Sequence, residues 1–258
     1  MVRIAVAVLF VWSSTHAFVP SPTSLLSKGT HPRIILDPTA ISQVKQRVTG
    51  VYATAYADIK AQAASSDIIA LSFLAVTEKA LGRDNRAFVQ SAYTAAVALC
   101  NEGFSSADWS SKDQAGRNNF LLGIAYDWLY TDLTLAQRAT LAKGCARWLD
   151  RGFSLYKQTS YHNMYGLIYY GLTINALAVY TSPEFMSISQ KGQLYLDECK
   201  AALDNHVRTV NEVGADGGGW HEGFQYGWEG GFGCFLVAME GWLTAAGENY
   251  FEKATGYS

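Results

Sequence analysis

The chain has 258 residues, of which 49% are hydrophobic and only 16% are charged, a composition typical of a compact globular protein rather than a disordered one. Its 20 basic and 22 acidic side chains give a net charge of −2 at pH 7. No basic run or stripe is present, so we expect no nucleic-acid partner.

The first 17 residues have the features of a secretory signal peptide. Arg3 supplies a short basic region, residues 4–12 form an apolar run, and the small residues Thr15 and Ala17 follow it. We therefore expect cleavage after about residue 17 and a secreted or periplasmic protein. The alternative is an uncleaved membrane anchor, but the apolar run is short for crossing a bilayer.

Helical periodicity dominates the rest of the chain. Asp37 is placed to cap a helix that has Pro38 at its first position, and Thr134 with Gln137 has the pattern of a capping box. Short connections favour antiparallel neighbours, and no series of alternating strands appears. We predict one all-α domain over residues 18–258, with helices near residues 39–61, 67–81, 84–101, 113–131, 134–156, 161–181, 184–212 and 220–246.

Four widely spaced cysteines fit an oxidising compartment but form no CxxC or zinc-binding pattern. They are Cys100, Cys145, Cys199 and Cys234, and each falls in a predicted helix. Buried thiols are the simpler expectation, and disulfide pairing stays open.

The segment from residue 158 to 183 carries His162 as its one acidic or basic side chain. Its length and apolar character raise the alternative of a transmembrane helix. Asn163, Asn175 and Thr173 argue against lipid on every side, and no Lys/Arg asymmetry frames the segment. We expect instead the inner helix of a two-layer helical assembly, with the membrane as an unlikely partner.

Residues 214–233 read GADGGGWHEGFQYGWEGGFG and hold nine of the 23 glycines together with five aromatic rings. Glu222 and Tyr226 stand four apart, so a helix would place them on one face. The glycines allow the backbone to approach a ligand closely. Aromatic rings such as Trp220 stack on sugar faces or pack in a core. The WHEGFQ segment has Gln225 where a zincin has its second histidine, so we expect no metal site.

Four segments, in order, resemble the heparinase II/III-like polysaccharide lyases, a family that includes alginate lyases and the related dermatan-sulfate epimerase. DGGGWHEGFQYGWEGG resembles the glycine-rich motif of the family that carries its glutamate and tyrosine. YHNMYGLIYYGLTINALA resembles its inner helix, which bears histidine or asparagine. HPRIILDP and AYDWLYTDLTLAQRATL resemble two structural segments, so that the likeness covers residues 31–246.

The resemblance implies an (α/α) toroid of antiparallel helix pairs, normally followed by a β-sandwich domain. About eight predicted helices make only an incomplete toroid, and we expect the chain to be a truncated form that lacks the β domain. We expect no cofactor in this chain, and a structural metal would belong to the missing domain.

The resemblance also implies cleavage of uronic-acid-containing glycans by β-elimination. In this reaction a base removes the proton on C5 of the sugar, and the bond to the C4 oxygen breaks without water. Tyr226 matches the catalytic tyrosine, which serves as base and acid. His162 and Asn163 match the groups that neutralise the sugar carboxylate, a task that suits neutral hydrogen-bond donors. Glu222 matches the acid of the motif, which binds substrate or orients its neighbours.

The residues themselves suggest further contacts with an acidic polysaccharide. His221 and Trp220 flank Glu222 in the same motif. Gln114 and Arg117, in KDQAGRNN, would line the cleft, with Arg117 pairing a substrate carboxylate. A solvated helix face is the alternative for this pair.

Three other functions stay open. A C5-epimerase would share the proton abstraction. A toroidal glycoside hydrolase would need paired carboxylates, for which Asp113, Asp127 and Glu222 are the candidates. A non-catalytic glycan-binding fragment would use the aromatic cleft without turnover.

Overall fold

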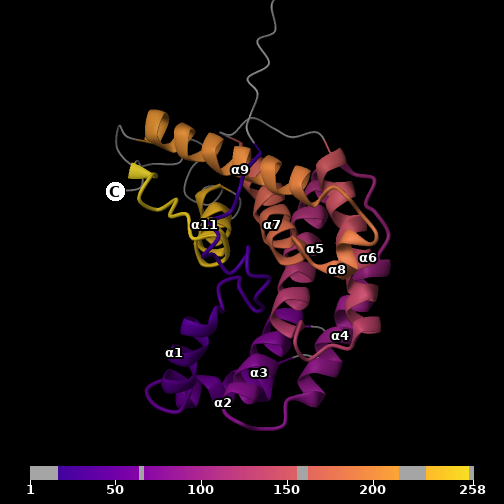
Figure 1. Cartoon of the computed structure of the whole chain (residues 1–258), viewed down its shortest axis with the longest axis vertical. Coiled ribbons are helices and arrows are strands. Elements are labelled where there is room, and N and C mark those ends of the chain that lie inside the picture. The colour runs from indigo at the N-terminus through magenta and orange to yellow at the C-terminus, as the bar shows by residue number, and fades with distance from the viewer. Residues whose placement is uncertain (1–16, 64–66, 156–161, 215–230, 256–258) are drawn as a thin grey trace, which may run out of the picture.

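A computed structural model describes residues 17–63, 67–155, 162–214 and 231–255, and every regular element in these ranges is a helix (Figure 1). The all-α prediction is therefore confirmed for the described residues. The elements are α1 (Pro38–Val48), α2 (Ala53–Gln62), α3 (Ile68–Ala80), α4 (Arg86–Asn101), α5 (Asp108–Leu129), α6 (Leu135–Ser154), α7 (Asn163–Val179), α8 (Pro183–Met186), α9 (Gly192–Thr209), the π-helical turn η1 (Val210–Gly214) and α11 (Phe232–Ala246).

Both predicted helix starts are confirmed. The side chain of Asp37 accepts a hydrogen bond from the Ala40 backbone N–H over 2.7 Å, and Pro38 opens α1. Thr134 and Gln137 form a reciprocal capping box at the start of α6.

Two predicted helices are each divided in two, and a hydroxyl side chain bonds to the backbone at each break. The range 39–61 breaks between α1 and α2, where the Thr49 hydroxyl donates to the carbonyl oxygens of Lys45 and Gln46. The range 184–212 becomes α8 and α9, and Ser189 accepts from the Lys191 backbone N–H in the turn between them. For the range 220–246 the structure describes the helical part as α11, and residues 220–230 lie outside the described ranges.

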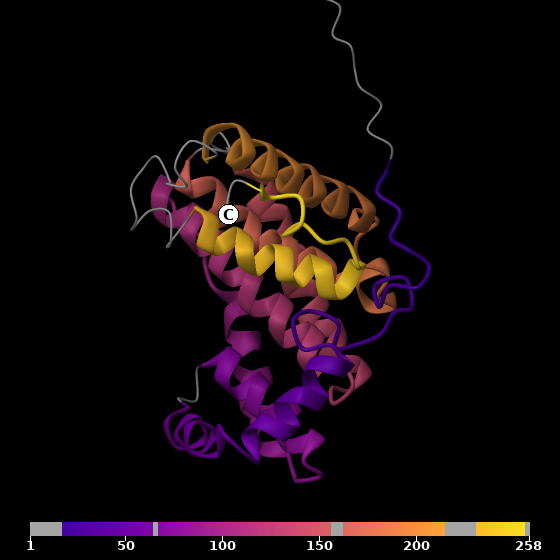
Figure 2. The ribbon, with the colours of Figure 1, turned by 90° about the vertical axis from the view of Figure 1, so that its left-hand side faces the viewer.

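The helices form two rows. In one row α3, α5, α7 and α11 are successive neighbours, while α4 and α6 pack together in a second row behind them, and α9 covers α7 and lies beside α11 (Figures 1 and 2). Every residue of α7 except Leu167 and Tyr170 is buried, which confirms the prediction of an inner helix. No helix in the described ranges is long and apolar enough to cross a membrane, and none of the four cysteines forms a disulfide.

Glycine contacts bring α5 and α7 unusually close together. A Cβ atom added at Gly116 would lie 1.6 Å from the Leu167 carbonyl oxygen, and one at Gly171 would lie 1.8 Å from that of Gly116. Any side chain at these positions would force the two backbones apart. Further along, Asn175 donates to the side-chain oxygen of Asn119 over 2.8 Å. Because residues 116 and 119 meet residues 167 and 175, the two helices run parallel.

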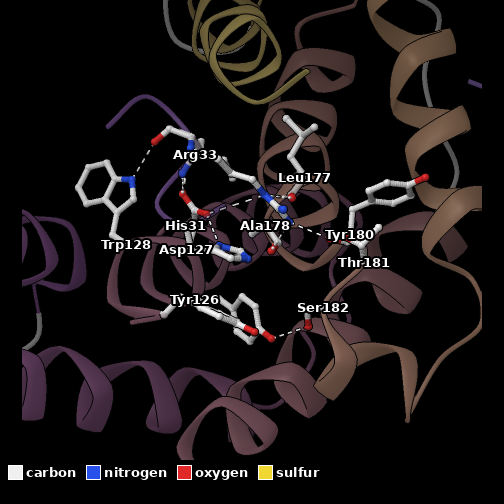
Figure 3. A network of polar contacts seen from close by, with 12 residues as sticks. His31, Arg33, Tyr126, Asp127, Trp128, Leu177, Ala178, Tyr180, Thr181 and Ser182 are labelled. Carbon is white, nitrogen blue, oxygen red and sulfur yellow. Dashed lines mark hydrogen bonds and ion pairs between the residues drawn. The ribbon is translucent and has the colours of Figure 1, made fainter. Parts of the chain in front are cut away.

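A buried carboxylate, that of Asp127 on α5, fixes the N-terminal segment against the helices (Figure 3). It accepts hydrogen bonds from His31 Nδ1 over 2.7 Å and from the backbone N–H groups of Arg33 and Ile34 over 3.0 and 2.9 Å. The next residue, Trp128, donates from its indole to the Ile34 carbonyl over 2.9 Å. The two segments HPRIILDP and AYDWLY are therefore parts of one buried contact.

The fully buried guanidinium of Arg33 closes the C-terminal end of α7. It donates to the carbonyl oxygens of Leu177, Ala178 and Tyr180 over 2.8–3.0 Å (Figure 3). A cation at this position also complements the negative end of the helix dipole. The anchor, by which we mean His31, Arg33 and Asp127, thus joins the N-terminal segment, α5 and α7.

Replacing Asp127 by Asn should lower the free energy of unfolding by about 3 kcal/mol, because one oxygen is lost and the buried Arg33 cation has no compensating charge. Chemical denaturation measures this change. Asp84→Asn is the matched control, since Asp84 pairs with Arg86 in an exposed position and should leave the transition unchanged. Equal transitions for the parent and Asp127→Asn would contradict the role given to the anchor.

Candidate functional site

The starts of α5, α7 and α11 and the end of α9 meet at the end of the protein opposite the anchor (Figure 2). The Tyr165 ring near the start of α7 lies 5.8 Å from the Phe235 ring near the start of α11. Its hydroxyl accepts from Asn205 near the end of α9 over 3.4 Å. We call this the open end. It carries His162, Asn163, Gln114 and Arg117, whereas Trp220, His221, Glu222 and Tyr226 lie outside the described residues.

His162 is the N-cap of α7. Its Nδ1 accepts a hydrogen bond from the Met164 backbone N–H over 3.1 Å. A ring nitrogen that accepts a hydrogen bond carries no hydrogen, so this contact places the ring hydrogen on Nε2. The side chain is half-buried and the first turn of α7 has no acidic residue. The cap therefore uses Nδ1 as the acceptor and makes Nε2 the donor of the ring.

Asn163 is the first residue of α7, and its side chain is buried. Consecutive helical residues point about 100° apart, so the sequence predicts that only one of His162 and Asn163 reaches a substrate carboxylate. Of the two, His162 is the more exposed.

The side chain of Gln114 forms hydrogen bonds with the loop after α4. Its side-chain oxygen accepts from the Ser105 backbone N–H over 2.8 Å, and its Nε2 donates to Glu102 Oε1 and to the Gly103 carbonyl over 3.0 and 2.9 Å. The amide is thus fully engaged within the protein. The predicted contact of Gln114 with substrate would require some of these bonds to break.

Glu102, which no sequence motif marks, interacts with three polar side chains of α5. Besides Gln114, it accepts from Asn118 Nδ2 over 2.7 Å, and its Oε1 lies 3.7 Å from Arg117 Nη2. The Arg117 side chain is 49% exposed in this long ion pair, so its guanidinium is accessible to solvent. Gly116 meets Leu167, so Arg117 lies about six residues, or roughly 9 Å of helix rise, from the level of His162.

The tyrosines of α7 at this end are poor bases. Burial raises the pKa of Tyr165 and of Tyr169. Burial also raises the pKa of Tyr170, which Asp113 raises further and Arg117 lowers. A phenol with a raised pKa stays protonated at neutral pH, so none of these three supplies a phenolate.

Two more residues of the open end escaped the sequence analysis. Trp109, in the first turn of α5, is 60% exposed, which is unusual for a residue of this size. Trp109, Asp113 and Arg117 are spaced by four, so they follow one face of α5. His206 on α9 is fully buried, and its ring stacks on Phe235 at 3.7 Å. No motif marks either residue, because exposure and stacking depend on tertiary packing.

One carboxylate considered for a hydrolase is excluded by its surroundings. Asp127 is fully buried in the anchor, with both oxygens bonded, at the end of α5 remote from His162. Its contacts are structural, so it has no access to a glycosidic bond.

Two hollows in the described part of the chain lie near the anchor. One, of about 230 Å³, is lined by residues that include Pro32 and Trp128. The other, of about 380 Å³, lies between Asp37 and Thr244. Among the described residues, no three His, Cys, Asp or Glu side chains come together so as to hold a metal ion.

Neither the models of known protein families nor the curated proteins give a match to this chain. The resemblance to the heparinase II/III-like lyases therefore stays a hypothesis carried by the motifs themselves.

His206 should make the open end sensitive to acid. Burial lowers its pKa from 6.5 to about 3, so the unfolded chain binds its proton first and stability falls as pH drops below about 6.5 towards 3. Between pH 7.5 and 5 this residue should cost on the order of 2 kcal/mol of unfolding free energy. Denaturation of the parent and of His206→Gln at both pH values measures the difference. Parallel pH dependences in the two proteins would contradict this expectation.

Proposed function

We propose that this protein is a secreted polysaccharide lyase that cleaves uronic-acid-containing glycans by β-elimination at the open end. The observation that carries the proposal is the position of His162, which caps an inner helix through Nδ1 and keeps its donor on Nε2. The glycine-rich motif that contains Tyr226 comes after α9 in the sequence. Near its end, α9 contacts the first turn of α7 through the hydrogen bond from Asn205 to Tyr165.

The reaction needs a hydrogen-bond donor at the sugar carboxylate, because negative charge builds up beside this carboxylate when C5 loses its proton. A neutral N–H donor together with the positive end of the α7 dipole would stabilise that charge without binding a proton itself. Arg117, half-exposed on the neighbouring parallel helix, would pair a carboxylate or sulfate on an adjacent sugar. The exposed ring of Trp109 would add a stacking surface further along α5.

Tyr226 would take the C5 proton as a phenolate and return a proton to the C4 oxygen as the glycosidic bond breaks. The two transfers leave the enzyme unchanged, and the products are a new reducing end and an unsaturated uronate. Glu222, four residues earlier, would bind substrate or orient the tyrosine, with His221 and Trp220 beside it.

The two rows of helices are compatible with part of an (α/α) toroid, the architecture that the motifs imply. We propose that α3, α5, α7 and α11 form its inner wall and that α4, α6 and α9 belong to its outer wall. An epimerase with the same base is the second candidate. It is favoured by the same His162 geometry, since proton abstraction at C5 is common to both reactions.

A screen on alginate, heparan, chondroitin and ulvan should yield an ultraviolet-absorbing unsaturated product from one of these polymers. Tyr226→Phe should abolish that product, since it removes the oxygen that carries the proton. Exchange of the C5 hydrogen with solvent, without the ultraviolet product, would identify an epimerase. Turnover that survives Tyr226→Phe would point to a hydrolase, and binding with no turnover in the parent would contradict catalysis.

His162→Ser separates the catalytic role of this residue from its structural one. Serine is a good N-cap, so α7 should keep its start and the midpoint of unfolding should change little. The Nε2 donor is lost, so kcat/KM should fall by about 100-fold or more. Leu135→Ala, at an exposed apolar position on α6, is the control and should change neither quantity. Retained activity in His162→Ser would exclude His162 from the site.

A further inference from the structure

The backbone of Phe18 is held on both sides by two side chains of α9. Its N–H donates to Asp197 Oδ1 over 2.7 Å, and its carbonyl oxygen accepts from Gln193 Nε2 over 2.8 Å. Gln193 also donates to Asp197 Oδ1 over 2.8 Å, so the two side chains are fixed to each other. Four residues apart on α9, they form a clamp around a single residue of the N-terminal segment.

The side chain of Phe18 is docked as well. Its ring lies 5.0 Å from that of Trp242 on α11, and Lys200 Nζ of α9 lies 5.9 Å from its centre. The residue before it, Ala17, is exposed. In Figure 1 this first coloured segment runs beside α9 and α11. Phe18 is therefore where the chain becomes attached to the seam between these two helices.

The clamp begins at the residue that the sequence predicts as the first of the mature chain. A signal sequence with small residues at Thr15 and Ala17 is cleaved after Ala17, which would leave Phe18 at the N-terminus. We propose that the Ala17–Phe18 bond is the processing site and that the new α-ammonium group of Phe18 forms an ion pair with Asp197. Processing would in this way create an ion pair that holds the new N-terminus at the seam between α9 and α11.

The step is a peptide hydrolysis by a signal peptidase. Water supplies the hydroxyl that completes the Ala17 carboxylate, and the nitrogen of Phe18 becomes an amine that is protonated at neutral pH. Its hydrogen bond to Asp197 then changes from a neutral N–H donor to a charge-assisted one, which is about twice as strong.

The surrounding charges favour this pair. Asp197 and Lys200 on α9 both contact Phe18, and Lys200 pairs with Asp204 at 2.9 Å and Glu248 at 3.6 Å. Tyr180 at the end of α7 donates to Gln193 and is uncharged, because burial and the Asp197 charge raise its pKa. Among the described residues, no cationic side chain pairs with the carboxylate of Asp197, which already contacts the Phe18 nitrogen.

The test compares the chain that begins at Phe18 with the same chain acetylated on its Phe18 nitrogen. At pH 6.5 the free form should have an unfolding equilibrium constant about fivefold lower, as for a partly buried ion pair. An α-amino group ordinarily has a pKa of about 7.7–8.0, and pairing raises it in the folded state. The stability advantage of the free form is therefore complete below the pKa of the α-amino group in the unfolded chain. It is lost as pH rises through the pKa of this group in the folded protein, and it should be absent at about pH 10.

Asp197→Asn should abolish the difference between free and acetylated chains, whereas Asp84→Asn, at an exposed position outside the clamp, should preserve it. N-terminal sequencing of the secreted protein should begin at Phe18. A different first residue, equal stability of the two forms at pH 6.5, or a difference that persists in Asp197→Asn would each overturn the proposal. These readouts measure processing and stability, so they are independent of the proposed lyase activity.

Discussion

The structure depends on one buried carboxylate, that of Asp127, which compensates the buried Arg33 cation and ties an irregular segment to two helices. A charge pair in a protein interior is costly unless its remaining hydrogen-bonding groups are satisfied. Here two backbone N–H groups and the His31 ring satisfy the carboxylate, and three carbonyl oxygens of α7 and the residue after it accept from Nε and Nη2 of Arg33, while its Nη1 has no hydrogen-bond partner among the described residues. His31 stays neutral, because burial lowers its pKa more than the bond to Asp127 raises it. The geometry of the anchor thus fixes how α5 and α7 meet.

The consequence appears at the other end of α7. Arg33 satisfies the carbonyl end of this helix, and the glycine contacts at Gly116 and Gly171 hold it close and parallel to α5. A rigid, almost uncharged inner helix then presents its N-terminal end, capped by His162, beside the polar start of α5. Binding groups held on rigid helices need less reordering when a ligand arrives than groups on loops.

The elements that depend on local chemistry were predictable from the sequence, and those that depend on distant contacts were not. The caps at Asp37 and Thr134 involve neighbours within three residues, and the inner position of α7 follows from its lack of charge. The pairing of Arg33 with Asp127 joins positions 94 residues apart, although the resemblance had already marked both segments. Glu102 carries no motif, so the engagement of Gln114 and Asn118 with it required coordinates.

The uncharged character of α7 also decides what the rest of the proposed site must supply. A helix whose tyrosines have pKa values raised by burial can present dipole and neutral donors to a sugar acid, but it provides no base. On the proposed mechanism the base must therefore come from another segment. The glycine-rich motif follows α9 and the turn η1 in the sequence and contains Tyr226. Its phenol would need nearby donors or positive charge to ionise, and the N–H of His162 and the guanidinium of Arg117 are groups of that kind at the open end.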